Sequence, residues 1–83
     1  MKLLYFAWLR EKVGVGEEDV SPPASVTTVR ALTEWLKAQG GSHAEAFAND
    51  AAVRVAVNQE YVNFDHPVAA GDEVAFFPPV TGG

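Results

Sequence analysis

Hydrophobic residues dominate the stretch KLLYFAWL, residues 2–9, whose aromatic and aliphatic content predicts a β-strand. Successive side chains of a strand point to opposite faces. One predicted face carries Leu3, Tyr5, Ala7 and Leu9, and the other carries Lys2, Leu4, Phe6 and Trp8. Both faces are largely apolar, which is typical of a central strand or of a strand with an exposed binding face.

A helical pattern follows in TTVRALTEWLKAQGG, residues 27–41. Thr28 or Thr27 offers a hydroxyl group for the N-cap, and two glycines stand where a C-cap belongs. The apolar stripe at spacings i, i+3 and i+7 consists of Val29, Leu32 and Leu36. This segment is therefore predicted to be the main helix.

The remaining predicted elements are short. The sequence predicts strands within residues 17–21, 52–58, 58–63 and 66–77, a proline loop at 21–26 and a helical turn within 42–50. In the last strand, Val74 and Phe76 are expected on one face, with Glu73, Ala75 and Phe77 on the other.

This order of elements predicts an α+β fold in which a mixed sheet of about five strands wraps one main helix. The first and last strands are the most apolar, so we expect them side by side at the centre of the sheet. The layout is that of a β-grasp (ubiquitin-like) fold. We expect a β-grasp domain at residues 1–77 and an extended C-terminal tail at 78–83.

The face that the helix leaves uncovered is predicted to be apolar as well. Leu4, Phe6 and Trp8 would share that face with Phe77, joined by Tyr61. A contiguous apolar patch on a small domain usually marks a partner surface. The alternative is that Phe6 and Trp8 cap one edge of the core beneath the proline loop.

Composition narrows the function classes. The 83 residues carry a net charge of −5 and no run of Lys or Arg, which argues against a nucleic-acid partner. The apolar run at 3–9 is too short to span a membrane and lacks a cleavage-site pattern, so we expect a cytoplasmic protein without a membrane partner. The chain has no cysteine, which excludes a thiol nucleophile and a thiolate metal site.

No catalytic constellation emerges from the other polar residues. His43 and His66 lie far apart without ligand spacing around either, which favours structural or surface roles and no metal site. The GVG at residues 14–16 lacks the lysine and the further glycine of a phosphate loop. The domain alone is not expected to be an enzyme.

The tail FFPPVTGG is the strongest candidate for the working part. Pro78 and Pro79 stop the last strand and favour an extended arm. Six residues reach on the order of 20 Å at ~3.3 Å each. Gly82 and Gly83 have no side chain and can enter a narrow channel. The alternative is an inert, frayed terminus.

Three stretches carry a resemblance that covers essentially the whole chain: LYFAWLRE (residues 4–11), AVNQEYVNFDHPV (56–68) and GDEVAFFPPVTGG (71–83). With them, the chain resembles the sulfur-carrier subunits of molybdopterin synthases, a ubiquitin-like β-grasp family. Tyr61 is the one departure, because that position is often aliphatic in the family.

The resemblance implies a mechanism in which the chain binds no cofactor. An E1-like activating enzyme uses ATP to adenylate the carboxylate of Gly83, and a sulfur donor converts the adenylate to a thiocarboxylate. The large synthase subunit, within a heterotetramer, receives the tail, and sulfur passes to a cyclic pterin monophosphate to form the dithiolene. The inserted arm would be Pro78, Pro79, Val80, Thr81 and Gly82, and Phe6 and Phe77 would contact partners.

Three alternatives share parts of this interpretation. A sulfur carrier for thiamine or another thiolated product would have the same ending and a different acceptor. A ubiquitin-like modifier would be joined to lysines of other proteins. A plain β-grasp binding module would have an inert tail.

Overall fold

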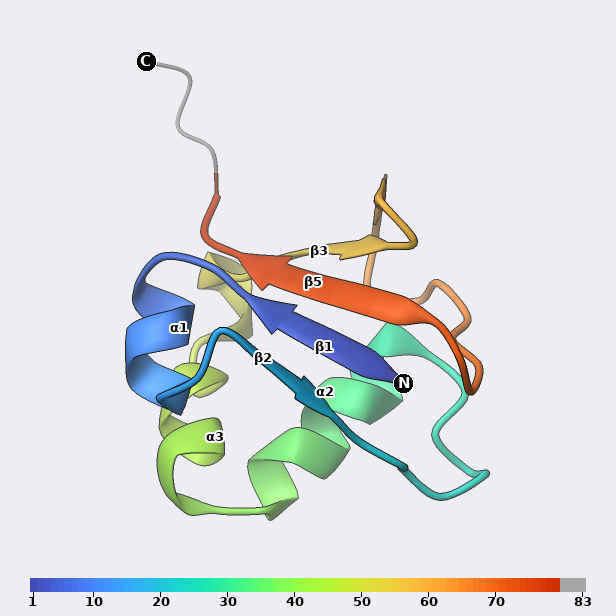
Figure 1. Cartoon of the computed structure of the whole chain (residues 1–83), viewed down its shortest axis with the longest axis horizontal. Helices are drawn as coiled ribbons and strands as arrows, with labels where there is room; N and C mark the ends of the chain where they lie inside the picture. Colours follow the sequence, from blue (N-terminus) through green and yellow to red (C-terminus); the bar gives the residue numbers. More distant parts are fainter. Residues whose placement is uncertain (80–83) are drawn as a thin grey trace.

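The computed structural model describes residues 1–79, which form a five-stranded mixed sheet with helices on one face (Figure 1). The strand order is β2-β1-β5-β3-β4. The elements in chain order are β1 (Lys2–Tyr5), α1 (Trp8–Val13), β2 (Glu17–Asp19), α2 (Val29–Ala38), α3 (Gly41–Ala46), a 3-10 turn (Asp50–Ala52), β3 (Arg54–Val57), β4 (Glu60–Val62) and β5 (Glu73–Phe77). The predicted β-grasp architecture is confirmed.

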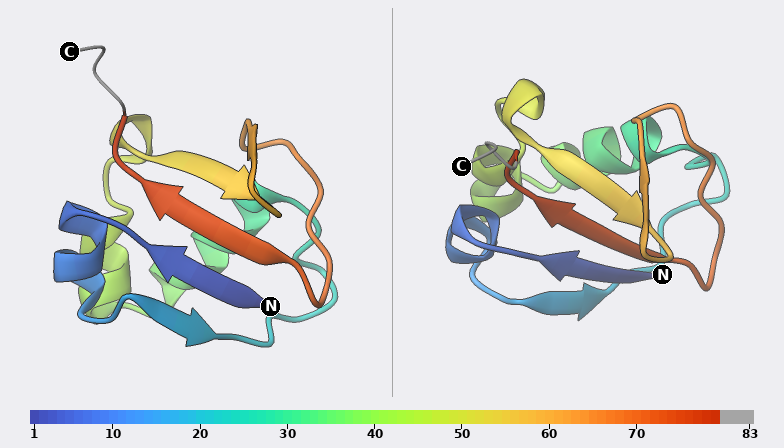
Figure 2. Two further views of the ribbon diagram at one scale, coloured as in Figure 1. Left: turned by 45° about the horizontal axis from the view of Figure 1, so that its top comes forward. Right: turned by 90° about the horizontal axis from the view of Figure 1, so that it is seen from above.

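The first and last strands lie side by side at the centre of the sheet, as predicted. β1 and β5 run parallel, with Leu3 opposite Val74 and Tyr5 opposite Phe76. β5 also pairs antiparallel with β3, where Arg54 lies opposite Phe77. The views in Figure 2 show that the helices lie on one side of the sheet and leave the other side uncovered.

The first strand is shorter than predicted, and this changes the placement of Trp8. β1 ends at Tyr5, and Ala7 adopts a positive φ of 55° before helix α1 begins at Trp8. Leu9 and Val13 lie one helical turn apart on α1, and both side chains are buried. Gly14 ends the helix in the left-handed conformation. Trp8 therefore packs partly buried against the core from α1 and does not share a strand face with Leu4.

The main helix begins and packs as the sequence predicts. The Thr28 hydroxyl oxygen accepts a hydrogen bond of 3.1 Å from the backbone N–H of Ala31, an N-cap interaction. Val29, Leu32 and Leu36 are fully buried, at 0–1% exposure. Helix α2 thereby presents its apolar stripe to the sheet.

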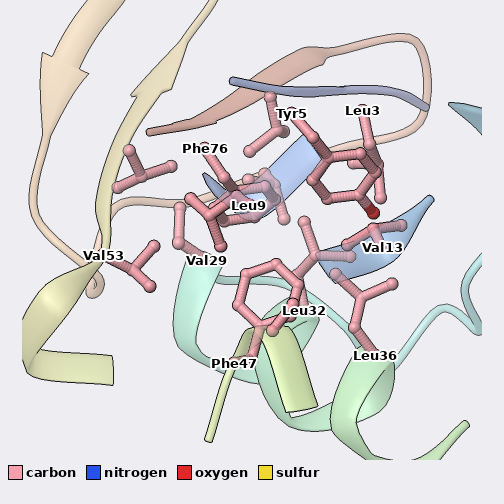
Figure 3. Packing of buried hydrophobic residues seen from close by; sticks show 14 of the residues in the cluster. Leu3, Tyr5, Leu9, Val13, Val29, Leu32, Leu36, Phe47, Val53 and Phe76 are labelled. Carbon is pink, nitrogen blue, oxygen red and sulfur yellow. The ribbon is translucent and has the colours of Figure 1, made fainter. Parts of the chain in front are cut away.

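Three aromatic rings form the centre of the core (Figure 3). The rings of Phe47 and Phe76 meet edge to face at 4.9 Å between centroids, and Tyr5 stacks on Phe76 at 6.1 Å. All three side chains are at most 1% exposed. Close aromatic packing on the helix-facing side of the sheet thus stabilises the central strands β1 and β5.

Candidate functional site

The uncovered face of the sheet carries an apolar row that crosses four strands. Leu4 on β1, Ala75 on β5, Ala56 on β3 and Tyr61 on β4 are successive cross-strand partners. Because side chains directly opposite one another project to the same face, these four residues form a continuous strip. The strip lies on the face opposite the helices.

Phe77 and Tyr61 form an aromatic pair on this face. Their ring centroids are 5.4 Å apart, and the Tyr61 side chain is 79% exposed. Phe77 is half-buried and lies outside the core cluster. A cavity of about 240 Å³ opens beside the two rings and is lined by Arg54, Val55, Tyr61, Val62 and Phe77. An exposed aromatic pair beside an apolar cavity can accept a side chain from a partner.

Phe6 lies at the same end of the sheet. Its backbone N–H donates a 3.1 Å hydrogen bond to the carbonyl oxygen of Phe76, and its side chain is 49% exposed. We call Leu4, Phe6, Tyr61 and Phe77 the open-face patch. The structure excludes Trp8 from this patch, because Trp8 lies on α1 and contacts the core.

The predicted tail begins where the open-face patch ends. β5 stops at Phe77, and Pro78 and Pro79 follow it half-buried and outside any strand. Proline has no N–H to continue the strand ladder, which accounts for this end point. The predicted arm residues Val80, Thr81 and Gly82 and the predicted carrier Gly83 lie outside the described residues.

Arg54 is a candidate that sequence reasoning missed. Its guanidinium Nη1 donates hydrogen bonds of 3.1 Å to the Ala51 carbonyl and 3.2 Å to the Val53 carbonyl. Across the sheet, Arg54 lies opposite Phe77, and it also lines the cavity beside Tyr61. Strand alternation puts Arg54 on the face opposite the buried Val55, but only the strand register reveals its neighbours across the sheet.

A second polar cluster lies away from the patch and has a structural role. Glu18 Oε2 accepts a 2.7 Å hydrogen bond from the Tyr5 hydroxyl and lies 2.7 Å from His43 Nε2, which links β1, β2 and α3. Burial, together with the hydrogen bond to Glu18 and its charge, raises the pKa of Tyr5 well above its usual value. In residues 1–79 the His, Asp and Glu side chains form no group of three suited to holding a metal ion.

Within the same range, no helix combines the length and the apolar character that crossing a membrane requires. His66 contributes backbone groups to the loop that flanks α2, where its carbonyl accepts a 3.0 Å hydrogen bond from Val29. Among the described residues, the exposed aromatic side chains Phe6 and Tyr61 both belong to the open-face patch.

A five-stranded mixed sheet in this strand order, with helices on one face and an apolar row on the other, places the chain in the ubiquitin-like β-grasp class of folds. The model of the ThiS family matches residues 3–83, so the chain belongs to this family. The chain is 49% identical over its full length to the molybdopterin synthase sulfur carrier subunit of Escherichia coli, covering 99% of that protein.

Solved structures agree with this assignment. A putative molybdopterin converting factor, subunit 1, from Pyrococcus furiosus superposes with a TM-score of 0.77 at 39% identity, over 95% of each chain. The small archaeal modifier protein 1 of Haloferax volcanii superposes with a TM-score of 0.75 at 29% identity, over 96% of this chain and 97% of that one. The resemblance inferred from the sequence is confirmed.

Proposed function

We infer that this chain is the sulfur carrier subunit of a molybdopterin synthase. The observation that carries the inference is the full-length identity of 49% to the Escherichia coli sulfur carrier subunit. We propose that sulfur is held on the carboxyl group of Gly83 and is transferred to a cyclic pterin monophosphate, forming the dithiolene of molybdopterin. The family match, which extends to residue 83, supports this role for the last residue.

The chemistry requires activation by a separate enzyme. A carboxylate is a poor electrophile, so we propose that an E1-like enzyme transfers the AMP part of ATP to the Gly83 carboxylate and releases pyrophosphate. Hydrosulfide released by a sulfur donor then attacks the acyl carbon, the bond between that carbon and the AMP oxygen breaks, and loss of the S–H proton to solvent leaves a thiocarboxylate. Its sulfur is nucleophilic at neutral pH and is delivered by the arm of residues 78–83. We place these steps in the cytoplasm.

The geometry supports a division between a recognition surface and a reactive arm. The open-face patch ends where Pro78 begins, so an enzyme that receives the tail would contact the patch at the same time. We propose that the large synthase subunit binds here, in a heterotetramer, and that the activating enzyme uses the same face. The clustering of aromatic residues at this position is typical of the energetic centre of an interface.

A second function has one specific observation in its favour. The Haloferax volcanii neighbour is a small archaeal modifier protein, and its chain is 29% identical to this one. A modifier would form isopeptide bonds through its last residue to lysines of other proteins. Such conjugates would survive denaturing electrophoresis as a ladder, whereas a dedicated sulfur carrier would not produce one.

The decisive experiment compares the wild-type protein with a variant that lacks Gly83 and one that carries an additional alanine after it. Each is incubated with ATP, the activating enzyme and a sulfur source, and its intact mass is measured. We expect the wild type to gain the mass of one oxygen-to-sulfur replacement in its C-terminal peptide, and neither variant to show this gain. Val15→Ala, an exposed change in the loop between α1 and β2, is the control.

The fold of the variants is checked by circular dichroism, so that a loss of the mass gain is not confused with unfolding. The same mass gain in the extended variant would contradict the role of Gly83. Absence of the mass gain in the wild type, with a demonstrably active activating enzyme, would contradict the sulfur-carrier function itself.

A further inference from the structure

The position of Arg54 indicates a more specific role in partner binding than the apolar contacts that the open-face patch offers. Arg54 opens β3 directly opposite Phe77, the last strand residue before the tail. Its Nη1 atom is held by two carbonyl oxygens, from Ala51 and Val53. These bonds orient the planar guanidinium and leave its other N–H groups available, so less conformational entropy is lost when a partner binds them.

The charge of Arg54 has no acidic partner within residues 1–79. Arg10 and Lys12 on α1 form no ion pair in that range either, and the other three side-chain cations are paired. Arg30 lies 3.2 Å from Asp65, Lys2 lies 3.5 Å from Glu17, and Lys37 lies 3.1 Å from both Glu34 and Asp50. The exposed Arg54 differs from Arg10 and Lys12 in its position, because it presents its positive charge beside the apolar cavity that Tyr61 and Phe77 line. Complementarity then calls for a carboxylate on the partner.

The cavity beside Arg54 indicates which kind of partner side chain lies next to that carboxylate. Its volume of about 240 Å³ suits one large side chain, and its aromatic walls are Tyr61 and Phe77. Aromatic and arginine side chains together are the residues most enriched at interface centres. An apolar side chain inserted here would bring its immediate neighbours to the guanidinium at the rim.

We propose that Arg54, Tyr61 and Phe77 form a specificity site for the large synthase subunit. The site takes an apolar side chain of that subunit into the cavity and pairs a neighbouring carboxylate of the same subunit with the Arg54 guanidinium. This paired recognition fixes the register of docking at the base of the tail, and therefore where residues 78–83 begin. The inference rests on the proposed function, which supplies the identity of the partner.

The test is the affinity of the purified large subunit for the full chain, measured by isothermal titration calorimetry at two salt concentrations. We expect Arg54→Ala to raise Kd about tenfold and Arg54→Glu about a hundredfold, because the reversal adds repulsion to the lost pair. Arg54→Lys keeps the positive charge but loses the planar guanidinium and its paired N–H donors. Its Kd should therefore lie between those of wild type and Arg54→Ala. The salt dependence of Kd should weaken in Arg54→Ala.

Arg30→Ala and Arg30→Glu are matched controls, because they make the same charge changes at an exposed arginine on α2. We expect both to stay within about twofold of the wild-type Kd, since long-range charge effects are screened at physiological salt. A double-mutant cycle between Arg54→Ala and Tyr61→Ala tests whether the two act as one site. Combined losses smaller than the sum of the single losses are expected.

The outcomes separate the inference from the proposed function. If wild type binds the large subunit and Arg54→Glu binds within about twofold of it, the specificity site is refuted while the sulfur-carrier function stands. An equal loss for the Arg30 and Arg54 reversals would also refute it, because the effect would then reflect net charge alone. If the wild-type chain does not bind the large subunit, the proposed function itself fails.

Discussion

The two faces of the sheet differ in burial although the same strands form them. On β5, Val74 and Phe76 face the helices and are completely buried, whereas Ala75 and Phe77 face outward and remain half-buried. The covered face meets three helices and a dense aromatic cluster. The open face carries Phe77 beside Tyr61, which is 79% exposed.

The difference shows that alternate residues of one strand can carry separate tasks. Phe76 stabilises the fold through the core, and Phe77 is free to serve recognition because it adds little to that core. The tail continues from the same strand, so the packing of Phe76 fixes the starting point of the arm. Mutations on the two faces should therefore separate stability from partner binding.

The largest expected effect is on the covered face. Phe76→Ala removes a fully buried ring that contacts Tyr5 and Phe47, and we expect it to lower the free energy of unfolding by about 3–5 kcal/mol. For a domain of this size that is a large share of the total stability. Urea denaturation followed by circular dichroism measures it. A loss below about 1 kcal/mol would show that the core does not depend on this ring.

Phe77→Ala should give the opposite pattern. We expect Kd for the large subunit to rise about 10- to 100-fold, because the ring forms one wall of the cavity beside Tyr61. The free energy of unfolding should change by no more than about 1 kcal/mol. Calorimetric binding and urea denaturation of the same preparation measure both quantities. Unfolding of this variant would contradict the separation of the two faces.

Sequence patterns predicted the strands and the main helix where one local signal dominates. Alternation placed Val74 and Phe76 inside and Phe77 outside, and the N-cap was predicted at Thr28 or Thr27, of which the structure uses Thr28. The first strand was predicted too long, because its apolar run has high β-propensity through Trp8. The positive φ of Ala7 ends it, and this turn depends on how α1 packs.

The candidate site was predicted only in part, because some of its residues carry a local signal in the sequence and others do not. Phe6, Tyr61 and Phe77 stood out as aromatic residues on exposed strand positions. Arg54 did not, because a charged residue on an outward face usually contacts only solvent. Arg54 becomes a candidate for partner binding because the strand register places it opposite Phe77. The link between Glu18 and His43 joins residues 25 apart in the chain, and no local pattern encodes it.

The smallest expected effect concerns the polar edge of the covered face, where Tyr5 reaches Glu18. The Tyr5 side chain is 1% exposed, and its hydroxyl donates a 2.7 Å hydrogen bond to Glu18 Oε2. A hydrogen bond to a charged group contributes about 1.5–3 kcal/mol, so Tyr5→Phe should cost about 1–2 kcal/mol at neutral pH.

The same tyrosine also makes a prediction about alkaline pH. Burial and Glu18 raise the Tyr5 pKa in the folded state above the unfolded value of about 10. Above that pH the unfolded chain loses the phenolic proton while the folded chain keeps it, so the free energy of unfolding should fall by up to about 1.4 kcal/mol per pH unit. Urea denaturation between pH 8 and 11 should show this slope in the wild type and a shallower one in Tyr5→Phe. Tyr61→Phe, on the open face, controls for the general loss of a tyrosine, and equal slopes in wild type and Tyr5→Phe would contradict the coupling of the buried hydroxyl to folding.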